Sequence, residues 1–489
     1  MATTIRSSLS RRQVLKAAAS VIAGSILASC GATPTPTLTP QPPTATTAPT
    51  KPPAPAAEPT KPPTPAPPPP TNTPAPAPTK APVAGKVVIM HQRNELSEDE
   101  QAQFEKANPT IKMEFIQADT TRFFAMYAAG TPPDLLRTQA PAIPNYLARK
   151  MLKDLTPFFE VSTVLKPADL APANNYYRAN GPLEIGQGKY YGMCKDWSPD
   201  FTLFINKKIF ADASVAVPDD TKSLTYDDIF VMAKKLTKME GNRVIRWGYG
   251  YGDWWVDRIW MNMLAEKKQE LFSDSFTKIN LSANDNAKAV VKWYFDIAKE
   301  NIVANPLNPS PTWNGEDFQK GTIAILQYGY WYSASAESDI TKGNVMMLPA
   351  PTWAGVRRDP TMTATGMVMV AATKVPEAAW KVFEWYNGQE PAITRAKSGW
   401  GVPALKSLYN LMPNTTPYQK QVQKVLQGEL ALETPPLQFN PFIGESTVAD
   451  TFAKYLQPAL KGDIKFEEML KKIEDEVNAA IKEGISRIG

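Results

Sequence analysis

The residues best suited to ligand chemistry in this sequence are aromatic. All twelve tryptophans lie after residue 86, and several adjoin glycine or proline in stretches typical of loops. Flat aromatic faces, combined with short carboxylates and amides, complement the C–H faces and hydroxyl rim of a sugar. The composition therefore predicts a site that binds carbohydrate by stacking. The tryptophans in such loop-like settings that we take as candidates are Trp254, Trp255, Trp331 and Trp400.

Each of these candidates has a structural alternative. Trp254 and Trp255 are adjacent, and one ring of such a pair usually packs inward. Trp400 precedes Gly401 and could pack beneath it. Four other tryptophans fit apolar stripes at helix or strand spacing and are expected in the core. They are Trp247, Trp293, Trp380 and Trp385.

Catalytic and metal-binding chemistry has little support in the sequence. The chain has one histidine, His91, which disfavours a Ser-His-Asp triad and a multi-histidine zinc site. It contains no nucleophile elbow, zinc-protease motif or phosphate-binding loop. We therefore predict no catalytic residue, no metal and no cofactor. Acids beside tryptophans, such as Asp253, Glu316 and Asp317, keep a secreted carbohydrate-active enzyme open as an alternative, and a surface adhesin is a second one.

Residues 1–29 are predicted to be an export signal. A basic start with Arg11 and Arg12 precedes an apolar run at 14–28, too short to span a bilayer comfortably. The stretch Ser10–Lys16 resembles a twin-arginine signal. The run ends in Leu-Ala-Ser-Cys, which resembles a bacterial lipobox and implies cleavage before Cys30 and lipidation of its sulfur. The protein is then expected at the outer face of the cell membrane, with an ordinary secretory signal as the alternative.

Residues 30–85 are expected to form a tether. Of the 47 prolines in the chain, 21 lie between Ala32 and Val83, among Thr and Ala and almost no bulky apolar residue. Such a segment cannot bury enough apolar surface to offset its ordering entropy. We expect it to remain extended between the lipid and the folded body.

Residues 86–489 are expected to form the folded, functional body of the protein. A body of this length exceeds the roughly 250–300 residues at which one core stops growing, so two lobes are expected. Seven of the 53 basic residues but only one of the 48 acidic residues precede Lys86, so the body carries a formal charge near −1. That charge disfavours nucleic-acid binding. The body's one cysteine, Cys194, is expected to be a half-buried small side chain, with a catalytic thiol as the alternative.

The pattern along the body is typical of an α/β fold. An apolar strand at 86–90, a helix from Ser97 to Ala107 and an alternating strand at 111–116 predict a strand-helix-strand unit and hence parallel pairing. A capped helix through Leu236, a helix beginning near Pro376 and an amphipathic helix over the last thirty residues continue the pattern.

In the order and spacing of its motifs the body resembles family 1 extracellular solute-binding proteins, the class that includes the maltose-type binding proteins. The departures from the family pattern are Ile205 before Asn206, where a Tyr is usual, and a missing Gly-Gly near 265–267, which bears on the loop shape around the ligand. The segments that carry the resemblance are 104–114, 130–134, 188–192, 204–208, 318–325, 329–331, 380–385 and 401–403.

The resemblance implies a two-lobe type II periplasmic-binding-protein fold, each lobe a mostly parallel sheet flanked by helices, joined by a hinge. We expect lobe one at 86–197 and 346–390, and lobe two at 198–345 and 391–489. It also implies capture of a small solute for an ABC import permease, by a protein expected to be monomeric. A sugar or oligosaccharide is the ligand that best fits the number of tryptophans in loops, with another polar organic solute as the alternative.

The resemblance also implies a set of ligand contacts. Trp331 matches a stacking aromatic of the maltose-type proteins, and His91 and Asn94 follow the first strand, where this fold places a ligand loop. Asp196 and Trp197 fall at the crossover between lobes. Gly366 follows a polar stretch and is expected to allow close backbone approach to the ligand.

Overall fold

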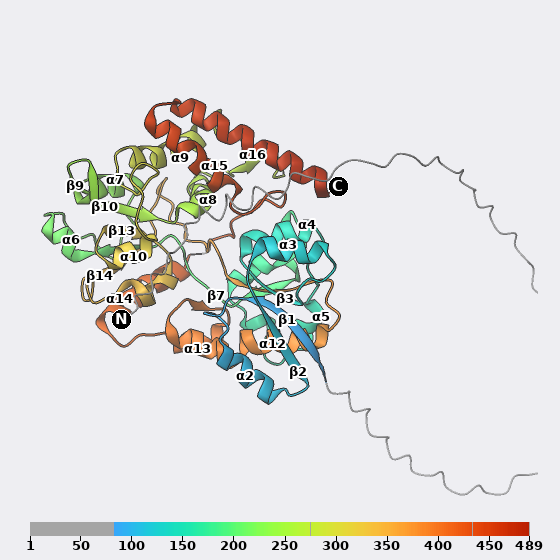
Figure 1. The fold of residues 1–489 in the computed structure, drawn as a ribbon. Helices are drawn as coiled ribbons and strands as arrows, with labels where there is room; N and C mark the ends of the chain where they lie inside the picture. The colour runs from blue at the N-terminus through green and yellow to red at the C-terminus, as the bar shows by residue number, and fades with distance from the viewer. Residues whose placement is uncertain (1–82, 274, 433, 489) are drawn as a thin grey trace, which may run out of the picture. The chain divides into compact units, whose positions relative to one another are not determined.

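The computed structural model of the chain describes residues 83–273, 275–432 and 434–488. Two five-stranded sheets organise this part of the chain (Figure 1). The export signal, Cys30 and nearly all of the expected tether lie outside the described residues. Within the described residues, no helix combines the length and apolar character needed to cross a membrane.

The first sheet has the strand order β2-β1-β3-β15-β6. Its strands are β1 (Gly85–His91), β2 (Ile111–Gln117), β3 (Leu135–Thr138), β6 (Gly192–Cys194) and β15 (Gly366–Met369). β1 pairs in parallel with β2 and β3, and β15 runs antiparallel to both β3 and β6. Four strands therefore share one direction, and the late strand β15 enters the sheet against them.

The second sheet has the order β14-β8-β13-β10-β9. Its strands are β8 (Leu203–Asn206), β9 (Lys238–Glu240), β10 (Arg243–Tyr251), β13 (Ile323–Gln327) and β14 (Val345–Leu348). β10 and β13 are parallel, and β8 is antiparallel to β13 and β14. β10, β13 and β14 thus share one direction, against β8 and β9.

Helices cover both sheets. The first sheet contacts α2 (Glu98–Ala107) and α12 (Pro376–Gly388), and the second contacts α7 (Tyr226–Leu236), α10 (Asn314–Gln319) and α14 (Pro417–Leu430). A layer of α8 (Val256–Glu266), α9 (Asp285–Lys299), α15 (Thr447–Lys461) and α16 (Phe466–Ile488) packs together beside the second sheet. The remaining α-helices are α3 (Thr120–Ala128), α4 (Ile143–Ala148), α5 (Thr156–Val161), α6 (Lys207–Asp212), α11 (Ser333–Ala336) and α13 (Glu390–Ser398).

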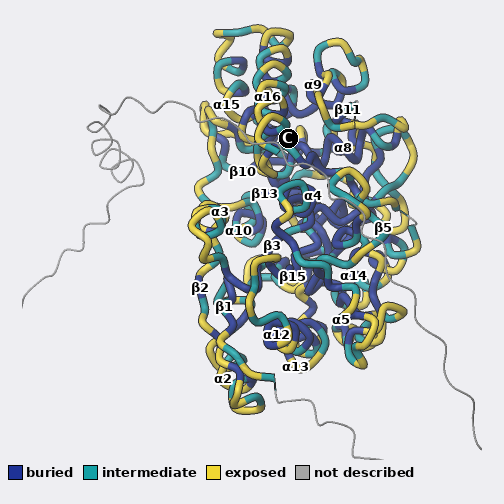
Figure 2. Tube along the Cα trace, turned by 90° about the vertical axis from the view of Figure 1, so that its right-hand side faces the viewer, coloured by how far each residue is buried: buried dark blue, intermediate teal, exposed yellow. Residues whose placement is uncertain are grey.

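Local sequence chemistry explains the best-defined helix starts. Ser97 and Glu100 form a reciprocal capping box at α2, and Thr225 and Asp228 form one at α7. Pro376 occupies the first turn of α12, where its missing N–H costs nothing. The predicted α/β architecture with two sheets is confirmed. β13 and β15 are buried along their whole length, whereas α2 carries many exposed positions (Figure 2). Cys194 is fully buried, deeper than the half-buried position expected, because β6 is buried in the first sheet.

Three chain segments connect the two sheets: 195–202, 349–365 and 399–416. In the first, β7 (Asp196–Trp197) pairs antiparallel with β16 (Val402–Pro403) of the third. Asp200 in the first segment accepts hydrogen bonds from Thr361 Oγ1 at 3.0 Å and the Met362 N–H at 2.6 Å, both in the second. The first connection is therefore hydrogen-bonded to each of the other two.

The chain crosses between the sheets at slightly different points from those expected. Met346, Met347 and Leu348 pair with β8 in the second sheet, so the boundary expected at 346 falls inside a strand. The helix α13, which begins at Glu390, packs on α12, and Arg395 Nη2 donates to the Tyr386 carbonyl at 2.8 Å.

Candidate ligand-binding site

Polar residues follow three neighbouring strands of the first sheet. β1, β2 and β3 are parallel, so their carboxyl ends meet at one edge, where α/β folds place ligands. A cavity of about 230 Å³ opens there, which we call the strand-end pocket. The polar residues that line it are Gln92, Asp119, Thr120, Arg137, Thr138, Gln139, Tyr146 and Glu445.

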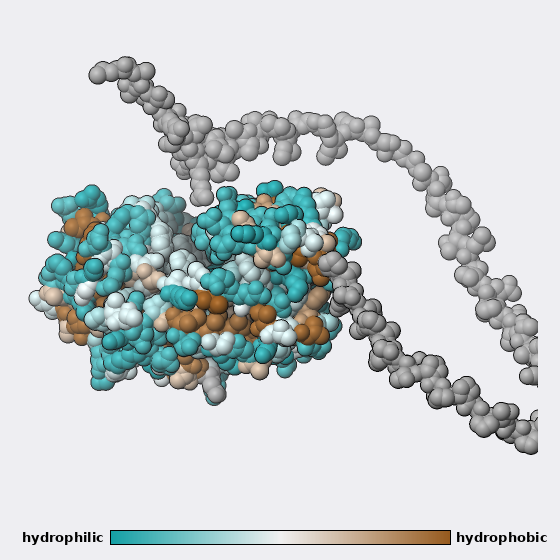
Figure 3. Space-filling view, turned by 90° about the horizontal axis from the view of Figure 1, so that it is seen from below, coloured by the Kyte–Doolittle hydropathy of each residue, from teal (hydrophilic) through white to brown (hydrophobic). Residues whose placement is uncertain are grey.

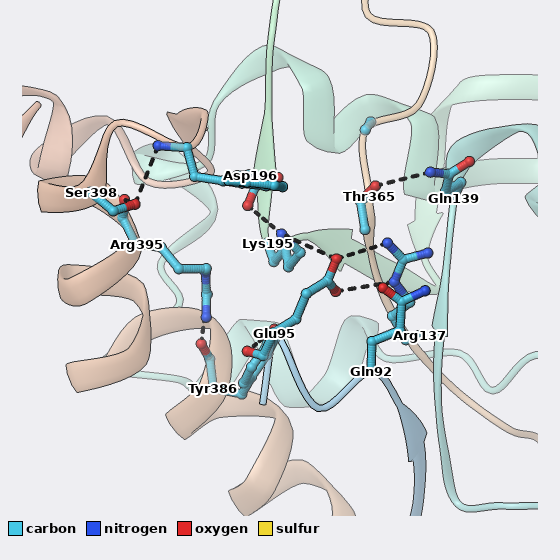
Figure 4. Close-up of polar contacts among 12 residues, drawn as sticks. Gln92, Glu95, Arg137, Gln139, Lys195, Asp196, Thr365, Tyr386, Arg395 and Ser398 are labelled. Carbon is cyan, nitrogen blue, oxygen red and sulfur yellow. Dashed lines mark hydrogen bonds and ion pairs between the residues drawn. The ribbon is translucent and has the colours of Figure 1, made fainter. Parts of the chain in front are cut away.

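A buried ionic network adjoins the strand-end pocket through Arg137, which lines it (Figure 4). Arg137 donates to both carboxylate oxygens of Glu95, at 3.1 and 2.8 Å. Lys195 Nζ lies 3.9 Å from Glu95 and 2.5 Å from Asp196. Burial pushes the pKa of Glu95 upward, but the Lys195 charge and the Arg137 hydrogen bonds outweigh it and lower the pKa to about 2. Glu95 is thus a fixed anion that orients the pocket's arginine.

Two predicted ligand residues lie at the crossover. Asp196 is buried and committed to Lys195, while Trp197 is half-buried and packs against both hydrophobic core clusters. Both belong to β7, the strand that joins the connecting segments. Asp196 and Trp197 therefore lie in the first connecting segment. Asp196 is paired with Lys195 there, and Trp197 packs against the hydrophobic core.

His91 ends β1 and points into the core. Its side chain is fully buried, its ring meets Tyr386 edge-on at 4.9 Å, and its Nδ1 accepts the Gln92 N–H at 2.9 Å. Burial lowers the pKa of His91 to about 3, so the imidazole is neutral. His91 does not line the strand-end pocket, but the next residue, Gln92, does.

Asn94 and Gly366 also lie away from this pocket. Asn94 is exposed but is not among the pocket residues. Gly366 sits in β15 between β3 and β6, where a Cβ would collide with the Met193 backbone oxygen and the Tyr177 hydroxyl. The close approach that Gly366 permits is therefore to a neighbouring strand and a core tyrosine.

The predicted tryptophans of the second sheet do come together, in a cluster that we call the aromatic ridge. Its members are Trp254, Trp255, Trp313, Tyr328, Trp331 and Trp400. Trp331 is central: its ring centroid lies 6.2 Å from Trp255, 5.0 Å from Tyr328 and 6.3 Å from Trp400. Trp254, Trp313 and Trp400 remain 45, 41 and 41 % exposed.

Strand pairing explains why these rings meet. β10 and β13 are parallel and end at Tyr251 and Gln327, so the turns that follow them emerge at one edge of the sheet. The first turn leads into the short helix η4 (Asp253–Trp255) and the second into η5 (Tyr330–Tyr332). At Gly252 a Cβ would lie 2.5 Å from the Trp255 ring, so glycine lets that ring fold back over the turn.

The two halves of the site are linked by an arginine. Glu445, which precedes α15, lines the strand-end pocket and accepts a hydrogen bond from Arg258 Nη2 at 3.3 Å. The Arg258 guanidinium lies 5.9 Å from the Trp255 ring centroid. A chain of contacts thus runs from the polar pocket of the first sheet to the aromatic ridge of the second.

Sequence reasoning missed several members of this arrangement. Trp313 follows a Pro-Ser-Pro-Thr stretch, a loop signal of the same kind that identified the other ridge tryptophans. Arg137 and Gln139 follow the apolar Leu135-Leu136 run. Their position at the end of a strand could have identified them as pocket residues. Within the described residues, no cluster of three or more His, Cys, Asp or Glu side chains is placed to hold a metal ion.

Known structures share this fold at low sequence identity. An ABC substrate-binding protein from Listeria monocytogenes in complex with cycloalternan aligns with a TM-score of 0.66 and 21 % identity, over 81 % of this chain and 98 % of that one. An ABC-transporter-associated binding protein from B. animalis subsp. lactis Bl-04, in complex with beta-1,6-galactobiose, gives 0.63 and 20 %, over 83 and 98 %.

A third structure is the maltose/maltodextrin-binding domain MalE from Bdellovibrio bacteriovorus bound to maltotriose, with a TM-score of 0.63 and 15 % identity, over 82 % of this chain and 100 % of that one. No curated protein sequence matches the chain significantly. The family model for bacterial extracellular solute-binding proteins matches residues 90–393, more than half of the chain. The protein therefore belongs to the bacterial extracellular solute-binding protein family.

Proposed function

We propose that this protein captures a sugar or oligosaccharide outside the cell and delivers it to an ABC import permease. The observation that carries the proposal is the aromatic ridge, in which three tryptophans keep more than 40 % of their surface exposed. Exposed flat rings are costly in water unless a ligand covers them. A sugar covers them well because its C–H faces stack while its hydroxyls bond to polar neighbours.

The strand-end pocket supplies the polar half of this recognition. Gln92 and Gln139 carry amides that both donate and accept, and Arg137 supplies fixed N–H donors. The ionic network holds Arg137 in place before the ligand arrives, so little ordering is needed on binding. Related proteins with bound sugars support this assignment of ligand class.

Capture occurs by closure of two lobes about the three connecting segments. We place lobe one at 86–194 and 366–398, and lobe two at 203–348 and 417–488. This division follows sheet membership and the packing of α13 on α12, and it moves the expected boundaries at 346 and 390.

The same proposal includes export and anchoring. Residues 1–29 direct export, Cys30 carries the lipid, and residues 30–85 tether the body at the outer face of the membrane, where it acts as a monomer. Growth with radiolabelled palmitate should label the protein, and Cys30→Ala should abolish the label and release the protein from the membrane fraction. Palmitate label retained in Cys30→Ala would contradict lipidation at that residue.

A ligand screen tests the central proposal. The full-length protein is heated with single sugars and oligosaccharides, and the melting temperature is recorded, because a ligand that binds only the folded state raises it. At least one carbohydrate should raise the melting temperature and give saturable binding by calorimetry. Gradual appearance of shorter sugars during incubation would instead indicate a secreted carbohydrate-active enzyme.

A further inference from the structure

A groove lies beside the aromatic ridge on the second lobe. It has a volume of about 410 Å³, larger than the 230 Å³ of the strand-end pocket. Its walls come from the turn after β10, the loop at 303–314 and α15. The residues on which the argument rests are Asp253, Trp254, Trp313, Asp450 and Ala453.

Two ridge tryptophans also form the wall of this groove. Trp313 stacks on Tyr328 at 6.0 Å and 14° and on Trp331 at 6.4 Å and 20°, yet it remains 41 % exposed. Trp254 meets Trp255 edge-on at 5.4 Å and remains 45 % exposed. The aromatic surface therefore continues from the ridge into the groove without interruption.

Carboxylates stand beside these rings with acceptor capacity to spare. Asp253 uses Oδ1 to accept the Trp254 N–H at 3.0 Å, and Asp450 uses Oδ2 to accept from Ser446 Oγ at 2.6 Å. Among the described residues, no hydrogen bond engages the second oxygen of either carboxylate. A free carboxylate oxygen beside an exposed ring is the combination that holds a sugar hydroxyl while its ring stacks.

We infer that this groove is a second sugar subsite, which binds the distal units of an elongated oligosaccharide whose other end lies at the strand-end pocket. The inference rests on the proposed function and specifies its substrate class: a chain of three or more sugar units. A monosaccharide would leave the groove, with its two exposed rings, uncovered. A volume of about 410 Å³ is within the range of small-molecule sites, about 300–1,000 Å³.

The test blocks the groove without touching the ridge or the pocket. Ala453 is exposed on α15 and lines the groove, so Ala453→Trp fills it with a bulky side chain. Ala479→Trp is the matched control, since Ala479 is also an exposed helical alanine, on α16, and does not line the groove. Calorimetry on full-length protein measures affinity for α-1,4-gluco- and β-1,6-galacto-oligosaccharides of two to six units.

In the wild-type protein the best-bound linkage should gain at least tenfold in affinity between two and six units. Ala453→Trp should remove this gain and leave disaccharide affinity within twofold, whereas Ala479→Trp should retain it. Disaccharide binding with no gain from length, or a gain that survives in Ala453→Trp, would overturn the groove subsite and leave sugar capture standing. Wild-type protein that binds no carbohydrate in the earlier screen or in this series would overturn both.

Discussion

The two halves of the candidate site differ in chemistry: one is polar and ionic, and the other is aromatic. On the first lobe, hydrogen-bonding side chains stand over a buried network in which Glu95, Arg137, Lys195 and Asp196 hold one another. On the second lobe, five rings of the aromatic ridge pack against one another, and Trp400 of the third connecting segment adds a sixth. Hydrogen bonds depend on direction and discriminate between hydroxyl arrangements, whereas stacking tolerates many. The first lobe should therefore decide which sugar binds, and the second how tightly.

Breaking the ionic half should produce the largest change in stability. Glu95→Gln leaves Arg137 and Lys195 buried without their shared anion, which should cost about 3–5 kcal/mol of unfolding free energy. Urea denaturation at pH 7 measures the loss. Glu240→Gln, which removes an exposed ion pair with Arg243, is the control and should change little. Equal losses in the two variants would show that the Glu95 network has no special structural role.

The two lobes should respond to acid in opposite directions, and His91 governs the first. Burial lowers its pKa from 6.5 to about 3, so between these values the unfolded chain binds a proton that the folded chain does not. The unfolding free energy should therefore fall as pH drops below 6.5, by about 3 kcal/mol at pH 4.5 from this group. His91→Asn should flatten this part of the stability curve; an unchanged slope would contradict the assignment.

Asp257 on α8 governs the opposite response. Burial raises its pKa from 3.8 to about 6, against the lowering effect of Arg258, so between these values the folded chain holds a proton that the unfolded chain has lost. Its contribution to the unfolding free energy is greatest below pH 3.8 and falls by about 3 kcal/mol as pH rises through 6. Asp257→Asn should therefore gain stability relative to wild type as pH increases from 4 to 7. Parallel curves for the two proteins would remove Asp257 from this role.

A smaller expected effect separates affinity from selectivity. Trp331→Ala should weaken binding of every sugar found in the screen at least tenfold, about 1.4 kcal/mol, because the ring at the centre of the ridge is lost. Gln139→Ala should instead alter the ranking among sugars. Calorimetry with a panel of epimers measures both. If Trp331→Ala reorders the panel while Gln139→Ala weakens all members equally, the division of roles is the reverse of ours.

The groove gives one more way to sharpen the comparison. Asp450→Asn keeps the size of the side chain but removes its charge, at a position that lines the groove and not the strand-end pocket. It should lower affinity for six-unit ligands a few-fold and leave two-unit ligands unchanged. An equal loss for both lengths would place the effect of Asp450 on the fold of α15, where it bonds Ser446.

Much of the architecture could be predicted because it is encoded locally. The capping residues of α2 and α7 and the apolar runs of β1 and β8 need no long-range information. The crossing near 346 was harder, because a short apolar strand can pair with either sheet and only tertiary pairing decides. β14 joins β8 in the second sheet.

Side-chain direction at strand ends explains the misplaced contacts. Successive residues of a strand point to opposite faces, so a shift of one position separates a core residue from a pocket residue. His91 took the inward position and Gln92 the pocket position, and the sequence does not fix where that alternation ends. The ridge was easier to predict because tryptophans in loops are often left at the surface. Trp313 also follows a proline-rich loop, and it was missed because that loop was not considered.

The hydrogen bonds among the connecting segments also constrain how the molecule can move. β7 is paired to β16, and Asp200 ties the first segment to Thr361 and Met362 of the second, so no connection can lengthen or rotate alone. Opening and shutting should then follow a single bending coordinate rather than a free swivel. A pair of spin labels, one on each lobe, would report two sharp distances that exchange population as sugar is added.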